Sequence, residues 1–148
     1  MDEIDRAAAV RDIEQLKARY FRTMDTKDWA ALESLFTPDL VADFRDATPE
    51  HQPAMLIRGA KPYLAALAPM LADVVTVHHG HMPEIVVESD AAARGVWAME
   101  DWLWPGETSP LPFRHLHGWG HYEETYRRID GIWRIASIRL TRLRVELS

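Results

Sequence analysis

The chain has 148 residues, of which 47% are hydrophobic and 27% are charged, and it contains no cysteine. These values fit a single domain, residues 1–148, with one hydrophobic core. The lack of cysteine excludes disulfides, thiolate metal ligands and a thiol nucleophile. A net charge of -6 disfavours contact with nucleic-acid phosphates. Because no apolar run of membrane-spanning length and no leader stands out, we expect a cytoplasmic protein without a membrane partner.

The first half of the sequence predicts three helices. Apolar residues recur there at spacings of three and four, which is typical of an amphipathic helix: Ile13, Leu16, Tyr20 and Met24. Asp28 is a plausible N-cap for a second, short helix over residues 29–36, which residues 37–39 should end. After a polar loop, Gly59 precedes a third apolar helix over residues 63–71.

The rest of the sequence predicts a sheet. Alternating, β-branched and aromatic residues indicate strands at residues 40–44, 74–79, 84–88, 92–104, 114–128 and 132–146. Turn residues separate the later strands at residues 80–83, 89–90, 105–112 and 130–131, the last an Asp-Gly hairpin signal. Helices followed by a long meander predict an α+β domain, in which a strongly curved, mostly antiparallel sheet wraps around the helices.

Tyr20, Asp25 and His78 offer a phenol, a carboxylate and an imidazole. An imidazole, with an ordinary pKa of about 6.5, accepts a proton near neutral pH, and a carboxylate on its other nitrogen fixes the tautomer and stabilises the cation. We therefore expect Asp25 and His78 to form an acid–base dyad and Tyr20 to donate to a substrate oxygen. Tyr20 also lies on the apolar stripe of its helix, so a packing role stays open.

The histidines leave two questions open. His78 and His79 point to opposite faces of a strand, so only one of them faces inward. Metal binding is the other interpretation of a sequence with this many histidines, which include His78, His79, His81, His115, His117 and His121. Neither a His-Glu-x-x-His helix nor a thiolate accompanies them, so we expect no metal.

Several segments, in their order along the chain, resemble the SnoaL-like branch of the nuclear-transport-factor-2-like (NTF2-like) superfamily. They are residues 20–29, 32–37, 76–85, 95–101, 120–122 and 130–135, and the resemblance extends over roughly residues 8–145. It implies a cone-shaped fold, whose concave sheet face and helices enclose an apolar pocket. The family includes ketosteroid isomerase, scytalone dehydratase, limonene epoxide hydrolase, polyketide cyclases, a bile-acid dehydratase and proteins without catalysis. Its enzymes of this kind generally work without a metal, and we expect no cofactor.

The dehydratase-like pattern of the family implies site residues on several elements. They are Tyr20, Asp25, His78, Asp101 and Arg142. The family's Thr-x-His spacing favours His78 over His79. On the last strand, Arg139 has the opposite parity to Arg142 and Arg144, and we take Arg142 as the arginine that faces the pocket. Whether Asp101 acts as a second base or as a protonated acid stays open.

Aromatic residues that line the cone would suit a flat apolar ligand, and we expect Trp97, Trp119 and Tyr122 among them. The resemblance thus implies a cofactor-independent, dehydratase-like lyase or isomerase for a small hydrophobic oxygenated molecule. The alternatives are a polyketide cyclase-like aldol catalyst and a non-catalytic module for ligand binding or dimerisation. Because superfamily members pair through the convex face of the sheet, we expect a homodimer or homotrimer.

Overall fold

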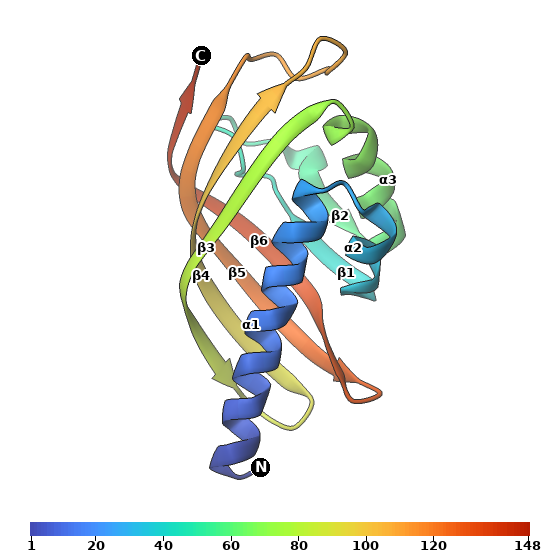
Figure 1. The fold of residues 1–148 in the computed structure, drawn as a ribbon, viewed down its shortest axis with the longest axis vertical. Helices are drawn as coiled ribbons and strands as arrows, with labels where there is room; N and C mark the ends of the chain where they lie inside the picture. The colour runs from blue at the N-terminus through green and yellow to red at the C-terminus, as the bar shows by residue number, and fades with distance from the viewer.

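The computed structural model describes all of residues 1–148, which form three α-helices on one side of a curled six-stranded sheet (Figure 1). The helices are α1 Glu3–Asp25, α2 Trp29–Ser34 and α3 Ala60–Leu71, with a short 3-10 helix η1 at Pro53–Met55. The strands are β1 Phe36–Asp43, β2 Leu56–Arg58, β3 Val74–Val87, β4 Ala92–Pro105, β5 Leu116–Ile129 and β6 Ile132–Leu147. The predicted α+β fold is confirmed.

The sheet has the strand order β2-β1-β6-β5-β4-β3. The four long strands β3 to β6 form the predicted antiparallel meander, and β2 is antiparallel to β1. Only β1 and β6 are parallel, because β1 enters from the helical hairpin and joins the sheet beside the last strand. The sheet is therefore mixed, although mostly antiparallel.

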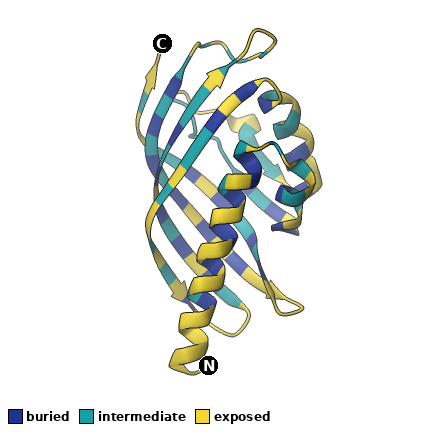
Figure 2. Ribbon diagram, viewed as in Figure 1, coloured by how far each residue is buried: buried dark blue, intermediate teal, exposed yellow.

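Helix α1 crosses the concave face of the sheet and buries one stripe against it, while its other face is exposed (Figures 1 and 2). Ile13, Leu16 and Tyr20 are at most 1% exposed. The Asp2 carboxylate accepts a hydrogen bond from the Asp5 backbone N–H at 2.8 Å and caps the start of the helix. At the other end, the last helical residue is Asp25, so the helix delivers this carboxylate to the sheet.

Two local predictions are wrong. The expected turn at residues 80–83 is a bulge within one continuous strand, β3, whose pairing with β4 shifts between His81 and Glu84. Residues 37–39 do not simply stop a helix: α2 ends at Ser34 and β1 already includes them. In both places, the flanking residues pair with a distant strand, so the chain stays within one strand despite the local turn signal.

Candidate active site

A cavity of about 790 Å³ lies between the concave face of the sheet and the helices. Two thirds of its 27 lining residues, 18 of them, are hydrophobic. Polar side chains from one helix and four strands converge on it: Tyr20, Thr76, His78, Asp101, Tyr122 and Arg142. The loop after β1 adds Thr48, Glu50 and Gln52. An apolar cavity with a few convergent polar groups is the arrangement expected of a small-molecule site.

Asp25 and His78 form the first polar pair of the cavity. The distance from His78 Nδ1 to Asp25 Oδ1 is 2.6 Å, and the backbone N–H of His78 donates to Asp25 Oδ2 at 2.9 Å. The hydroxyl of Thr76 donates to Oδ1 at 2.9 Å, so the carboxylate is an acceptor on both oxygens. An acceptor at Nδ1 places the ring proton there and leaves Nε2 with its free electron pair. Because His78 lines the cavity and Asp25 does not, the carboxylate supports the ring from behind.

Asp101 and Arg142 form the second polar pair. Arg142 donates from Nη1 to Asp101 Oδ1 at 2.6 Å and from Nη2 to Oδ2 at 3.0 Å, a bidentate ion pair. Its Nε donates to the backbone carbonyl of Ala47 at 2.9 Å. The two pairs face each other, since His78 Nε2 lies 4.0 Å from Asp101 Oδ2. The cavity therefore has a cluster of charged and hydrogen-bonding side chains on a mostly apolar wall.

A bulge on β6 separates the candidate arginines. Gly120 pairs with Arg142 while Trp119 pairs with Arg144, which leaves Leu143 without a partner in the register. Arg142 therefore faces the cavity, and Arg144, despite its even number, is exposed and paired with Glu146. Arg139 is also outside, near Asp43 and Asp46.

Tyr20 and Tyr122 complete the polar lining. Their rings meet edge to face with centroids 6.0 Å apart, and each residue is 1% exposed. Burial raises the pKa of both hydroxyls well above the ordinary tyrosine value. Both phenols are therefore neutral hydrogen-bond donors at physiological pH, and neither serves as a base.

A buried polar network, which the sequence did not reveal, supports these tyrosines. Lys17 forms an ion pair with Glu124, and both side chains are fully buried. The Lys17 ammonium also lies 3.9 Å from the Tyr20 ring centroid and 3.7 Å from that of Tyr122. Tyr126 donates to the other Glu124 oxygen at 2.5 Å. An amphipathic stripe does not predict a paired lysine, because the partner comes from a distant strand.

Trp97 and Trp119 need a correction, since neither lines the cavity. Trp97 faces inward but lies farther along the sheet, where its indole N–H donates to the Tyr126 hydroxyl at 2.9 Å. Trp119 faces outward and contacts His117, with ring centroids 3.9 Å apart. Of the three predicted aromatic contacts, Tyr122 alone is at the cavity. The other side of β3 carries His79, whose side chain is 55% exposed, so His78 is the inward histidine.

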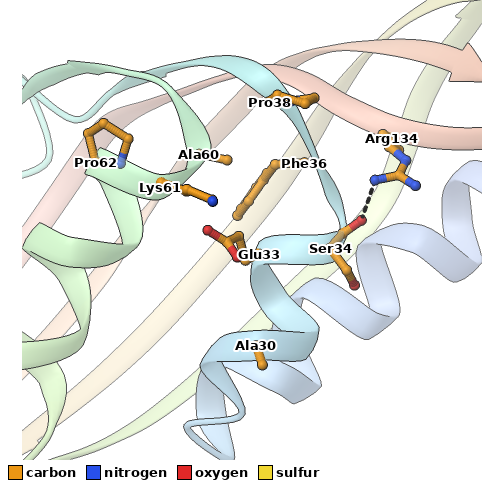
Figure 3. A pocket seen from close by; sticks show the side chains of 9 residues that line it. All are labelled: Ala30, Glu33, Ser34, Phe36, Pro38, Ala60, Lys61, Pro62 and Arg134. Atoms are coloured by element: carbon orange, nitrogen blue, oxygen red, sulfur yellow. Dashed lines mark hydrogen bonds between the residues drawn. The ribbon is translucent and has the colours of Figure 1, made fainter.

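A second hollow of about 470 Å³ lies between α2, the start of α3 and strands β1 and β6 (Figure 3). Glu33, Lys61 and Arg134 are its charged residues, and Arg134 donates to the backbone carbonyl of Ser34 at 3.2 Å. It contains no histidine and no tyrosine. Of these two hollows, only the larger is lined by a histidine and by tyrosines.

Residues 5–139 match the family model described as the SnoaL-like domain. The chain belongs to the SnoaL-like family. Solved structures with the same fold include a candidate scytalone dehydratase from Novosphingobium aromaticivorans, with a TM-score of 0.83 and 18% identity over 98% of this chain and 91% of that one. A hexachlorocyclohexane dehydrochlorinase, LinA type 2, has a TM-score of 0.79 and 17% identity over 99% of this chain and 93% of that chain.

A Mycobacterium tuberculosis protein of unknown function also shares the fold of this SnoaL-like chain, with a TM-score of 0.76 and 24% identity over 97% of this chain and 78% of that one. Identities this low show a common fold and nothing finer. The predicted family and NTF2-like fold are confirmed. Among the helices, none is long and apolar enough to cross a bilayer.

Proposed function

We propose that this SnoaL-like protein is a cofactor-independent lyase or isomerase that acts by proton transfer on a neutral, hydrophobic, oxygenated small molecule. The observation that carries the proposal is the Asp25–His78 pair, with Nδ1 held at 2.6 Å and the ring at the wall of an apolar cavity. A positioned base of this kind contributes on the order of 10² to 10⁴ in rate. The names of two structural neighbours, a dehydratase and a dehydrochlorinase, denote eliminations and support the same class.

In the proposed dehydration, His78 Nε2 takes a proton from the carbon next to a carbonyl. The C–H electron pair forms the carbon–carbon double bond as the neighbouring C–O bond breaks, and the leaving hydroxyl departs as water with a proton returned by the imidazolium. The neutral Tyr20 phenol donates to the carbonyl oxygen, where negative charge develops. Asp25 orients His78 and stabilises its cation.

The Asp101–Arg142 pair has a supporting role in this proposal. Bidentate contact with Arg142 suits an ionised Asp101, so we propose that Asp101 stabilises the imidazolium across the 4.0 Å gap and does not act as a protonated acid. Arg142 holds it there and polarises the cavity wall. The guanidinium also donates to Ala47, so few of its donors remain for a substrate anion. We therefore propose that the substrate is neutral.

The test is turnover of a panel of ring-bearing β-hydroxy ketones and β-hydroxy thioesters by wild type, His78→Ala and Asp25→Asn. We expect at least a hundredfold loss of turnover in both variants with folding kept. His79→Ala is the matched control, because its side chain is one residue away on the exposed face, and it should turn over normally. Full activity in both His78→Ala and Asp25→Asn would refute the proposal.

Two alternatives remain proposals. A polyketide cyclase-like aldol closure would use the same base, and the volume of the cavity admits a multi-ring product. Analysis of products from linear and ring substrates separates closure from dehydration. A non-catalytic binding or dimerisation module would bind an apolar ring compound and release it unchanged.

We also propose a homodimer or homotrimer in the cytoplasm, with the convex face as the contact surface. The Trp102 and His117 rings are stacked there with centroids 4.4 Å apart, and the Trp119 ring lies tilted against His117 with centroids 3.9 Å apart. Sedimentation of wild type against Trp102→Arg tests this surface.

A further inference from the structure

Lys27, just beyond the end of α1, has a backbone conformation that its side chain does not favour. Its φ is 60°, in the left-handed region that usually holds glycine or asparagine after a helix. A lysine there is strained, and strain of this kind often marks a side chain with a function. The position of the Lys27 ammonium indicates what this function is.

The Lys27 ammonium begins a hydrogen-bond chain that ends at His78. Nζ donates to the Thr76 hydroxyl at 2.8 Å, Thr76 donates to Asp25 Oδ1 at 2.9 Å, and the same oxygen is 2.6 Å from His78 Nδ1. An ammonium has no acceptor, so the Thr76 oxygen must accept from it and turn its proton to Asp25. Lys27 thereby fixes the direction of the whole chain.

We propose that Lys27 is a positioning residue that acts through Thr76 to draw charge from Asp25 and so lowers the proton affinity of the His78 ring. This inference rests on the proposed function only in taking His78 as the base. A carboxylate shared between a cationic chain and an imidazole stabilises the imidazolium less than an unshared carboxylate does. The ring then releases its proton more readily at the end of each cycle.

The other charges around His78 come from two further strands. Asp101 on β4 faces Nε2 at 4.0 Å, and Arg142 on β6 neutralises that carboxylate. Burial lowers the pKa of the Lys27 amine, while the charge of Asp25 opposes this shift. Because none of the variants below touches Asp101 or Arg142, a change at His78 reports the Lys27 chain.

The experiment is an NMR titration of ¹⁵N-histidine-labelled protein without any substrate, with the His78 ring signals identified by their loss in His78→Gln. Removing the cation in Lys27→Met or Lys27→Gly should raise the midpoint pH of His78 by about 0.3 to 0.7 unit, the size expected for a screened charge several ångströms away. Lys27→Arg should restore the wild-type midpoint. Arg22→Met removes an exposed cation from the last turn of α1 and should leave the midpoint unchanged.

Lys27→Gly also separates side chain from backbone. Glycine suits a φ of 60°, so this variant should be at least as stable as wild type while its midpoint rises. Thr76→Val should raise the midpoint as well, and the double variant with Lys27→Met should shift it by less than the sum. An unchanged midpoint in folded Lys27→Gly overturns the inference. A raised midpoint supports it even where every variant, and wild type, fails to turn over a substrate, and that failure counts against the proposed function alone.

Discussion

Gly118 on β5 lies against the guanidinium of Arg142 on β6, and the Asp101–Arg142 ion pair occupies the space that a side chain at Gly118 would need. A Cβ there would come within 2.7 Å of Asp101 Oδ1, closer than real Cβ contacts allow. The ordinary backbone of this strand does not require glycine. Glycine is required at position 118 because the Asp101–Arg142 ion pair lies against it.

Gly118→Ala should therefore push the ion pair apart. We expect a loss of about 1 to 3 kcal/mol in the free energy of unfolding, as for other overpacked sites, and a tenfold or greater loss of turnover. Urea unfolding and steady-state kinetics measure the two effects. Gly131→Ala is the control: its φ of 80° makes alanine costly, but it has open space around it and should keep full turnover. Equal kinetics for both variants would contradict the account.

Removing one partner of the Asp101–Arg142 pair should cost more than removing both. Their side chains are 4% and 9% exposed, so Arg142→Met leaves a nearly buried carboxylate without its partner, which typically costs about 3 to 5 kcal/mol. The double variant Asp101→Leu/Arg142→Met should recover part of that stability. Chemical denaturation of the three proteins tests this, and a double variant less stable than Arg142→Met would contradict it.

The stability of the fold should rise between about pH 8 and pH 10. Burial lowers the pKa of Lys17 to about 8, so in this window the unfolded chain binds more protons than the folded one. Above pH 10 the trend should reverse, because burial raises the pKa of Tyr20 and Tyr122 and only the unfolded chain releases those protons.

Thermal unfolding across this pH range measures the Lys17 effect. The double variant Lys17→Met/Glu124→Gln removes the titrating amine together with the charge of its partner, so most of the rise between pH 8 and pH 10 should disappear. The remainder comes from Lys27, whose pKa burial also lowers. The reversal above pH 10 should remain in that variant, since both tyrosines are kept. A rise of the same size in the double variant would assign the effect to another group.

Tyr20→Phe should separate catalysis from packing. The ring and its contacts with Phe36 and Tyr122 remain, so we expect stability within about 1 kcal/mol of wild type. Loss of the donor to the developing oxyanion should lower kcat by about 10- to 1000-fold with little change in KM. Tyr20→Leu keeps neither the aromatic ring nor the hydroxyl donor, so it should lose both stability and turnover. Normal kcat in Tyr20→Phe would assign the residue to the core alone.

Spacing along the chain was sufficient to predict the helices, the long strands β4 to β6, the α+β class and the inward position of Tyr20, whereas β3 was expected as two separate strands. These features depend on periods of 3.6 and 2, which neighbouring residues set among themselves. The N-cap role of Asp28 was also predictable from the neighbouring residues, and its side chain accepts from the Ala31 backbone N–H at 3.3 Å. The pairing of Asp25 with His78 was expected from the chemistry of the two side chains and from the family resemblance, because no local pattern joins a helix end to a strand 53 residues away.

Long-range pairing decided the rest. The pairing of β5 with β6 shifts by one residue at Leu143, and this bulge puts Arg142 inside and Arg144 outside. Trp97 faces inward but lies beside Tyr126, farther along the sheet than the cavity, and Trp119 faces outward beside His117. Partners on other elements determine the roles of Lys17, Lys27, Thr76 and Gly118. In a regular strand the face on which a side chain lies follows from local geometry, but bulges and neighbours depend on how distant segments pack, and charge pairs depend on neighbours.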